Sequence, residues 1–266
     1  MCVAKGLCME LNQVGLYLLD LDGTFYLGDE LLPGAAEFLG ICRTKNIPFA
    51  FLTNNSSRSA SDYIDKLSRM GISIFRDEIF TSGDAALWWM EKNKYPKDIL
   101  LIGTNSLKED FRTHGYIVDS PYPQAVVLGF DTDINYEKLT MLCNTVSSGI
   151  PYIATHPDVT CPVRKGKIPD VGAVIAFVKA ATGRVPDEII GKPNILMAQM
   201  ISFQRRIPVE TFCMIGDRLY TDIAFGNGLF DTILVLSGES SMDDLESSTV
   251  QPSRVFPSIK EIANCL

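Results

Sequence analysis

Two aspartates one residue apart, Asp20 and Asp22, directly follow the apolar residues 16–19. A short apolar run that ends in a turn signal is typical of a buried strand in a parallel sheet. Ligands of open α/β sheets bind outside the carboxyl ends of the strands, and strand residues two apart face the same side. Because two carboxylates this close repel each other, they favour a divalent cation or a shared proton. We therefore expect chemistry at this stretch.

The pattern Asp-x-Asp-Gly also occurs in calcium-binding loops and in plain surface turns. An EF-hand loop that began at Asp20 would need a glycine and a glutamate where this chain has Phe25 and Leu31. The EF-hand is therefore excluded. A plain turn is disfavoured as well, because it would not follow a solidly apolar strand.

A second polar turn, formed by Thr53, Asn54 and Asn55, lies between an apolar run and a helical pattern. A hydroxyl group and backbone N–H groups at the start of a helix can bind an anion. Ordinary helix capping by the next two residues, Ser56 and Ser57, is the alternative.

Two more positions could complete a site of this kind. Lys192 stands between a glycine and a proline, and an ammonium fixed there could balance the charge of carboxylates and a phosphate. An ordinary solvated lysine is the alternative. Asp217 follows another predicted strand, whereas the dipole of the following helix would by itself explain Asp222. Together, Asp20, Asp22 and Asp217 could provide ligands for Mg²⁺.

The two histidines, His114 and His156, have no cysteine or second histidine at ligand spacing, so we do not expect zinc. His156 follows a predicted strand and could contact a substrate or have a structural role. Glycine motifs of dinucleotide folds and P-loops are absent, and so is the Gly-x-Ser-x-Gly elbow of hydrolases.

The amino-acid composition indicates which classes of binding partner the protein can have. The chain has 266 residues and a formal net charge of −8, so no basic surplus is present to bind nucleic acid or a membrane surface. No run of about 18 apolar residues predicts a membrane span, and the start of the chain, up to Met9, is too short for a secretory signal. Seven scattered cysteines without a Cys-x-x-Cys pair favour reduced thiols and a cytoplasmic location.

Hydrophobic periodicity predicts alternating strands and helices, which implies right-handed crossovers and a parallel sheet. The predicted strands are 16–19, 47–53, 99–103, 125–130, 150–155, 211–215 and 232–236. The predicted helices are 35–45, 58–70, 84–94, 105–114 (with Asn105 as its cap), 136–148, 171–182, 194–203, one from 221, and 258–264.

A single sheet with all of these strands would be large for the chain. The carboxylate-rich turns that follow predicted strands lie near both ends of the sequence. The middle of the chain has no comparable turn. We therefore predict a discontinuous core, residues 1–82 and 188–266, with a second α/β domain inserted at 83–187.

Taken together, four motifs resemble those of the haloacid dehalogenase-like phosphatases, in that family's order: DLDGT at Asp20, TNN at Thr53, GKP at Lys192 and GDRLYTD at Asp217. The insertion between the second and third motifs is similar to the cap of the NagD-like branch. Thr81-Ser82-Gly83, Thr155-His156-Pro157-Asp158 and Thr182-Gly183 add to this resemblance. Many members have Thr-Asn-x-Asp in the cap loop, where this chain has His156.

The resemblance implies a doubly wound, Rossmann-like parallel-sheet core with a smaller α/β cap. It implies that Asp20 attacks phosphorus and becomes an aspartyl phosphate, while Asp22 serves as general acid and base. Mg²⁺ would be held by Asp20, Asp217 and the backbone carbonyl of Asp22.

For the remaining motif residues, the resemblance implies binding and support. Thr53, Asn54 (through its backbone N–H) and Asn55 would bind the phosphoryl group. Lys192 would balance charge on that group and on Asp20, and Asp222 would hold Lys192 or a metal-bound water.

The implied substrate is a small phosphorylated metabolite, and the cap surface is a candidate face for a homodimer. Alternatives within the superfamily are a phosphoryl mutase or a phosphonatase, the latter using Lys165 or Lys167 as a Schiff-base lysine. A phosphorylation-responsive signalling module of the receiver type is disfavoured, because such domains have no room for an insertion of about a hundred residues, which is far too long for a loop. A non-catalytic phosphate-binding module is disfavoured, because all four motif positions are intact.

Overall fold

The structure is a computed structural model that describes residues 10–163, 166–226 and 228–266. The segment before Met9 and the candidate Lys165 lie outside the described residues. Two compact units make up the described chain. The first unit contains the described residues up to Thr53, Ile64–Phe80 and Ile201–Leu266, and the second contains Asn54–Tyr63 and Thr81–Met200.

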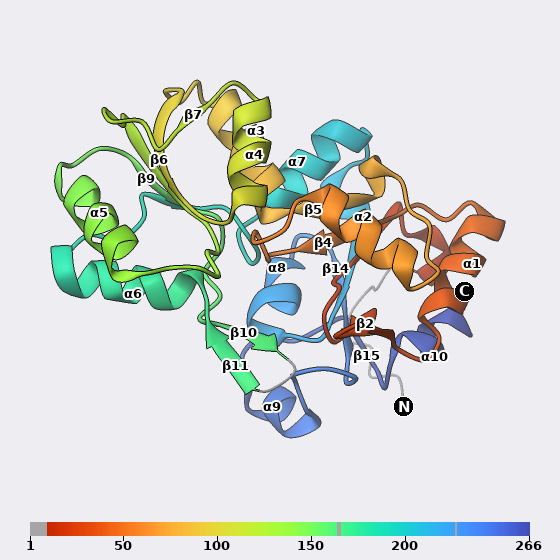
Figure 1. The fold of residues 1–266 in the computed structure, drawn as a ribbon. Coiled ribbons are helices and arrows are strands. Elements are labelled where there is room, and N and C mark those ends of the chain that lie inside the picture. Colours follow the sequence, from red (N-terminus) through yellow and green to blue (C-terminus); the bar gives the residue numbers. More distant parts are fainter. Residues whose placement is uncertain (1–9, 164–165, 227) are drawn as a thin grey trace. The chain divides into compact units, whose positions relative to one another are not determined.

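The first unit is built on a six-stranded sheet (Figure 1). In sheet order the strands are β15 (Arg254–Phe256), β14 (Asp231–Val235), β13 (Phe212–Gly216), β1 (Leu16–Leu19), β4 (Phe49–Thr53) and β5 (Ile79–Thr81). Strand β1 pairs in parallel with β13 on one side and with β4 on the other, and β14 continues the parallel sheet to β15. All four residues of β1 are buried, which explains why its sequence is apolar throughout.

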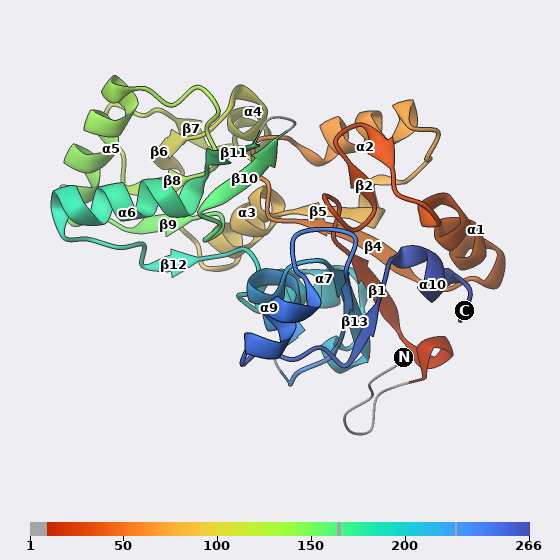
Figure 2. The same cartoon turned by 90° about the horizontal axis from the view of Figure 1, so that it is seen from below.

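Helices and a small hairpin make up the rest of this unit, and two of the helices, α2 and α7, also contain residues of the second unit. Their bounds are α1 (Ala35–Lys45), α2 (Ala60–Arg69), α7 (Leu196–Arg205), a π-helical turn (Leu219–Ile223), α8 (Ala224–Gly226), α9 (Met242–Ser247), α10 (Ile259–Ala263), β2 (Tyr26–Leu27) and β3 (Glu30–Leu31). Helix α1 packs against α10 (Figure 2). Its buried residues, Ala35, Phe38, Leu39 and Cys42, have the spacing of one helix face.

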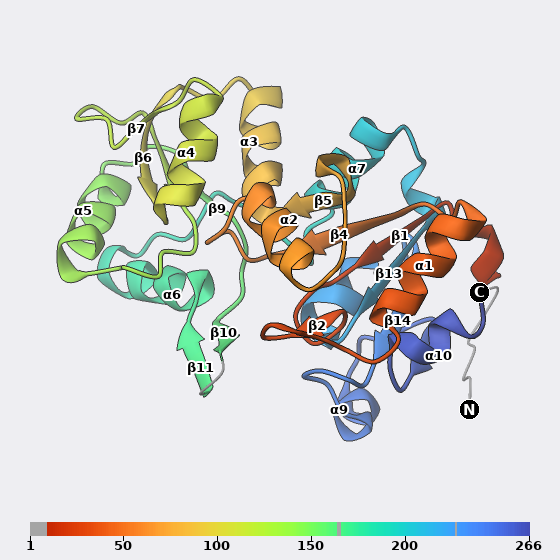
Figure 3. The same ribbon diagram turned by 45° about the vertical axis from the view of Figure 1, so that its right-hand side comes forward.

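The second unit has its own five-stranded parallel sheet. In sheet order the strands are β12 (Glu188–Ile189), β9 (Tyr152–Ala154), β8 (Ala125–Leu128), β6 (Asp98–Ile102) and β7 (Ile117–Val118). Within this unit, α5 (Tyr136–Ser147) and α6 (Val171–Thr182) lie on one face, and α3 (Ser82–Lys92) and α4 (Asn105–Thr113) on the other (Figures 1 and 3). An antiparallel hairpin, β10 (Thr160–Val163) and β11 (Gly166–Pro169), precedes α6.

The predicted fold class, a parallel-sheet α/β core with a smaller α/β unit inserted, agrees with this architecture. The second unit, residues 54–63 and 81–200, contains the predicted insertion 83–187 and extends beyond it at both ends. No strand is predicted at 188–189, yet β12 pairs with β9 of the second unit. None of the helices among the described residues is both long and apolar enough to cross a membrane.

Three local predictions need correction. Helix α4 is capped by Thr104 rather than Asn105, because the Thr104 hydroxyl accepts a hydrogen bond from the Leu107 N–H. Ahead of α2, the hydroxyl of Ser59 accepts from the Asp62 N–H, so neither Ser56 nor Ser57 is the cap. The helix expected from residue 221 begins instead as the π-helical turn at 219.

The cap of α4 gives a test of these assignments. The Thr104 hydroxyl also donates to the Ser57 carbonyl at 2.8 Å. We expect Thr104→Ala to lower the free energy of unfolding by about 1–2 kcal/mol, since both bonds are lost. The matched variant Asn105→Ala, at the exposed first residue of the helix, should change it by less than about 0.5 kcal/mol. Denaturant unfolding of both variants measures this, and a larger cost for Asn105→Ala would contradict the assignment.

Candidate active site

Asp20, Asp217 and Asp222 come together in the first unit, at the carboxyl ends of β1 and β13. The register Leu19↔Ile215 places these strand ends side by side, and the Asp20 N–H donates to the Ile215 carbonyl at 2.9 Å. One carboxylate oxygen from each aspartate lies within 4.8 Å of the other two. Asp217 and Asp222 are buried, whereas Asp20 is partly exposed. Carboxylates this close favour a bound cation.

Glycines allow the backbone to approach these carboxylates. A Cβ atom on Gly238 would lie 2.0 Å from Oδ2 of Asp217, and one on Gly216 would lie 2.3 Å from Cβ of Asp222. Gly23, in the turn after Asp22, has a φ of +89° and would also collide with Asp217. A side chain at any of these three glycine positions would therefore collide with the carboxylate group.

The turn after β13 positions Asp222. Its carboxylate accepts a hydrogen bond from the Arg218 N–H at 3.1 Å, and its own N–H donates to the Arg218 carbonyl. The π-helical turn from 219 to 223 places this side chain five residues after Asp217 and back beside it. π-Turns of this kind are frequent at functional sites.

The loop after β14 also bonds to Asp217, and no residue of this loop was among the predicted site residues. The Glu239 N–H donates to Oδ2 of Asp217 at 2.7 Å, and the Ser240 N–H donates to its carbonyl. The Ser237 hydroxyl donates to the Gly23 carbonyl at 2.8 Å. The available signal was a Ser-Gly-Glu-Ser turn after a predicted strand, the same context as the other site turns.

Arg218 contributes positive charge to the group. Burial disfavours its charged form, but the neighbouring carboxylates of Asp20, Asp217 and Asp222 outweigh this and raise the pKa of Arg218 above its ordinary value. The guanidinium is therefore charged.

Asp22 has a different environment from Asp20. Its Oδ2 accepts a hydrogen bond from the Tyr26 hydroxyl at 3.2 Å. The ammonium of Lys66 lies 3.7 Å from the centroid of the Tyr26 ring, and both of these side chains are buried. The Tyr26 hydroxyl thus orients the Asp22 side chain, whereas the Asp20 side chain lies with those of Asp217 and Asp222. Thr53, which ends β4, reaches the same sheet edge through the register Leu19↔Phe51.

In the second unit, Asn54 and Lys192 are bound to each other. The Asn54 side chain accepts from the Lys192 N–H at 2.8 Å and donates to the Lys192 carbonyl at 2.9 Å. The same amide group lies 3.2 and 3.3 Å from the two carboxylate oxygens of Asp158, and the Ser82 hydroxyl donates to the Asn54 carbonyl. The Asn54 side chain is therefore engaged with protein groups and fixes the main chain at Lys192, whereas the group predicted to bind phosphate is the Asn54 backbone N–H.

Asn55 and His156 also have protein partners. Asn55 Oδ1 accepts from the N–H and the hydroxyl of Ser57, the pattern of a local turn. His156 is completely buried, with Nε2 at 2.9 Å from Asp170 Oδ1 and Nδ1 at 3.0 Å from Thr155 Oγ1. These contacts favour a structural role for His156.

The buried set His156, Asp158 and Asp170 also has ligand atoms within 4.8 Å of one another. Asp170 accepts from the Val171 N–H and so caps α6, while Asp158 accepts from Asn54. Because these hydrogen bonds explain why the three side chains are buried, we assign no ion to them.

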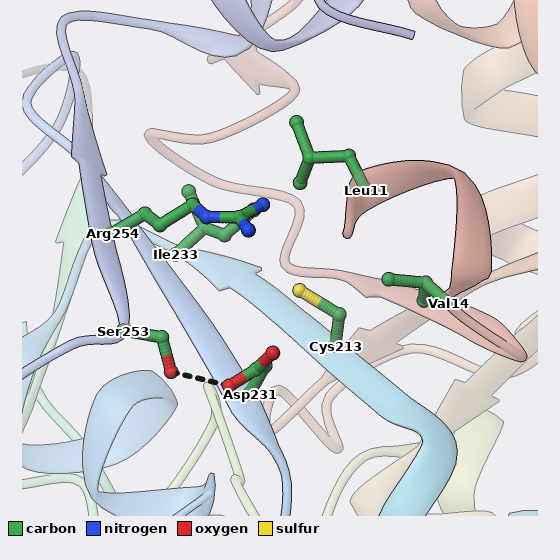
Figure 4. A pocket seen from close by; sticks show the side chains of 7 residues that line it. All are labelled: Leu11, Val14, Cys213, Asp231, Ile233, Ser253 and Arg254. Atoms are coloured by element: carbon green, nitrogen blue, oxygen red, sulfur yellow. Dashed lines mark hydrogen bonds between the residues drawn. The ribbon is translucent and has the colours of Figure 1, made fainter. Parts of the chain in front are cut away.

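The pocket drawn in Figure 4 is a separate feature of the first unit. It is lined by Leu11, Val14, Cys213, Asp231, Ile233, Ser253 and Arg254. These residues lie at the amino ends of β1, β13, β14 and β15, whereas the carboxylate group lies at the carboxyl ends. The pocket therefore belongs to the opposite edge of the sheet and contains none of the predicted site residues.

Two family models match the chain. A haloacid dehalogenase-like hydrolase model covers residues 17–117, and a second model of HAD-hydrolase-like proteins covers 189–262. Among curated proteins, an acid sugar phosphatase from Staphylococcus saprophyticus is 32% identical over 248 residues, which are 92% of this chain and 95% of that protein.

Solved structures of similar proteins share the fold over nearly the whole chain. A 4-nitrophenylphosphatase from Thermotoga maritima has a TM-score of 0.93 and 44% identity, covering 96% of this chain and 98% of that one. NagD from Escherichia coli K-12 has a TM-score of 0.86 and 29% identity, covering 94% and 98%. A glycerol phosphate phosphatase from Mycobacterium tuberculosis, in complex with magnesium, has a TM-score of 0.87 and 25% identity, covering 96% and 78%.

The pairing of Asn54 with Lys192 can be tested by unfolding. We expect Asn54→Ala to lower the free energy of unfolding by about 2–3 kcal/mol, because it removes the partners of two backbone groups at a buried residue. Asn54→Asp should cost at least as much, since its carboxylate would face the Lys192 carbonyl and Asp158. The control Asn55→Ala loses the local turn with Ser57 and the amide contact to Cys161 Sγ, and should cost about 1 kcal/mol. Equal costs for the two alanine variants would contradict the pairing.

Proposed function

Because the chain belongs to the NagD-like branch of the haloacid dehalogenase-like phosphatases, we propose that it hydrolyses small phosphate monoesters with Mg²⁺ and an aspartyl-phosphate intermediate. The observation that carries this proposal is the grouping of Asp20, Asp217 and Asp222 at one sheet edge. The names of the relatives favour sugar phosphates, glycerol phosphates and nitrophenyl phosphate as the substrate class.

The donor set fits a hard divalent cation. All of its ligand atoms are carboxylate oxygens, and Mg²⁺ prefers oxygen over nitrogen or sulfur. Asp20, Asp217 and the backbone carbonyl of Asp22 would hold the ion, and Asp222, whose carboxylate lies beside them, would hold a metal-bound water. When bound, Mg²⁺ would neutralise phosphoryl oxygens, so that a carboxylate can approach an anionic ester.

Asp20 is the proposed nucleophile. Its carboxylate oxygen forms a bond to phosphorus as the bond between phosphorus and the ester oxygen breaks. Asp22 gives a proton to the departing alkoxide, and the same residue then takes a proton from the water that attacks the aspartyl phosphate. Inorganic phosphate and the free carboxylate of Asp20 result. The Tyr26 hydroxyl keeps the Asp22 side chain in one orientation during both steps.

Thr53 is proposed to bind the phosphoryl group from the end of β4, next to β1. For the Asn54 N–H, Asn55 and Lys192, which belong to the second unit, the proposed phosphoryl-binding roles come from the motif resemblance. Lys167, considered for carbon–phosphorus cleavage, is exposed on β11, whereas a Schiff-base lysine needs a desolvated setting.

The nucleophile assignment is tested with p-nitrophenyl phosphate. We expect Asp20→Asn to lower kcat by about three orders of magnitude or more, because no carboxylate is left to attack. The same substitution at Asp29, in the exposed turn between β2 and β3, should leave kcat unchanged. EDTA should abolish wild-type turnover and Mg²⁺ should restore it. Normal turnover by Asp20→Asn would exclude Asp20 as the nucleophile.

The role of Asp22 predicts a dependence on the leaving group. Nitrophenolate departs without protonation, so Asp22→Asn should still form a phosphoenzyme from p-nitrophenyl phosphate. Its hydrolysis should slow by about a hundredfold or more, since no base activates water. Turnover of glycerol phosphate should fall further, because its alkoxide needs a proton. Rapid-quench detection of phosphoenzyme measures both steps, and equal losses for the two esters would argue against the acid role.

A further inference from the structure

Arg218 and Glu239 form an ion pair beside the proposed metal-binding carboxylates. The Arg218 Nε atom lies 3.0 Å from Glu239 Oε2, and the two side chains are only 13% and 30% exposed. The Tyr220 hydroxyl lies 3.3 Å from both carboxylate oxygens of Glu239, which fixes that side chain from a second direction. None of these three residues belongs to the set that the motifs select for metal binding or catalysis.

Each member of the pair is also bound to the carboxylate group through its main chain. The Glu239 N–H donates to Asp217, and the Arg218 N–H donates to Asp222. Arg218 follows Asp217 directly in sequence, and the charges of Asp20, Asp217 and Asp222 all act on its guanidinium. The pair is therefore a fixed part of the site's electrostatics.

We propose that the ion pair of Arg218 and Glu239 sets how tightly the carboxylates of Asp20, Asp217 and Asp222 bind a divalent cation. The inference rests on the proposed function in one respect, namely that this group binds Mg²⁺. The guanidinium repels an incoming cation and so weakens binding, whereas the Glu239 carboxylate offsets part of that repulsion. In a half-buried setting such interactions are stronger than in water.

The proposal assigns opposite signs to the two residues. Arg218→Met removes a positive charge, so the affinity for Mg²⁺ should increase. Glu239→Gln keeps an oxygen for Arg218 but removes the negative charge, so the affinity should decrease. A structural role alone would weaken binding in both variants, because either change would loosen the turn that holds Asp217.

The experiment is calorimetric titration of the metal-free, full-length protein with Mg²⁺ and no substrate. From the size of nearby charge interactions we expect the Kd to fall about fivefold in Arg218→Met and to rise about threefold in Glu239→Gln. The double variant should lie within about twofold of wild type, since the two charge effects oppose each other. Arg218→Lys keeps the charge and should stay within about twofold of wild type.

Controls separate charge from folding. Arg205 and Asp77 form an ion pair at 3.0 Å in the same unit, where α7 ends and before β5 begins. Arg205→Met and Asp77→Asn should leave the Mg²⁺ affinity unchanged. Thermal unfolding of every variant shows whether it is folded at the titration temperature.

The outcomes distinguish this inference from the proposed function. Loss of Mg²⁺ binding in Asp217→Asn, with unchanged or weaker binding in Arg218→Met and Arg218→Lys alike, would overturn the inference and leave the metal site standing. Wild-type protein that binds no Mg²⁺ would overturn both. Opposite shifts in the two single variants, cancelled in the double variant, would support it.

Discussion

Electrostatic repulsion among three aspartates is the constraint on which the first unit depends. Parallel pairing of β1 with β13 brings Asp20 and Asp217 to one edge, and the π-helical turn returns Asp222 to them. Such a group is stable only where donors and positive charge face it. The Glu239 and Arg218 N–H groups supply the donors, the Arg218 guanidinium supplies charge, and glycines let these main-chain segments come close.

In the second unit the main constraint is different: buried polar groups need hydrogen-bond partners. Asn54 bonds both main-chain groups of Lys192, and His156 bonds Asp170, which in turn caps α6. Hydrogen bonds satisfy these buried polar groups. These bonds fix the positions of the main chain and side chains in this unit. Asn54 and Lys192, both of which belong to the family motifs, are bonded to each other.

Much of the fold could be predicted because its strongest signals are local. Helices 35–45 and 171–182 have the predicted bounds, since each combines a clear apolar face with a left-handed residue at its end, Asn46 and Gly183. Strand β12 has two residues, too few for a period to show, and it is a strand only because β9 lies beside it. Thr104 and Asn105 are both good caps, so that only the structure decides between them.

The site was predictable where it consists of side chains at strand ends and was hidden where it consists of main chain. Asp20 and Asp217 stand at the ends of apolar runs, which sequence alone reveals. The Glu239 N–H has no side-chain signature, and Gly238 matters only because Asp217 lies against it. The partner of Asn54 lies 138 residues further along the chain, a separation that no local pattern spans.

His156 shows how a buried residue can affect the protein through the side chain that it holds in place. Its ring is fully buried, and both nitrogens face protein oxygens, so a substitution there changes the position of Asp170 before it changes any surface. Asp170 accepts the first N–H of α6, and the hairpin formed by β10 and β11 leads directly into that helix. His156 therefore helps to anchor this segment through Asp170, and an effect of His156 on the choice of leaving group would follow from that anchoring.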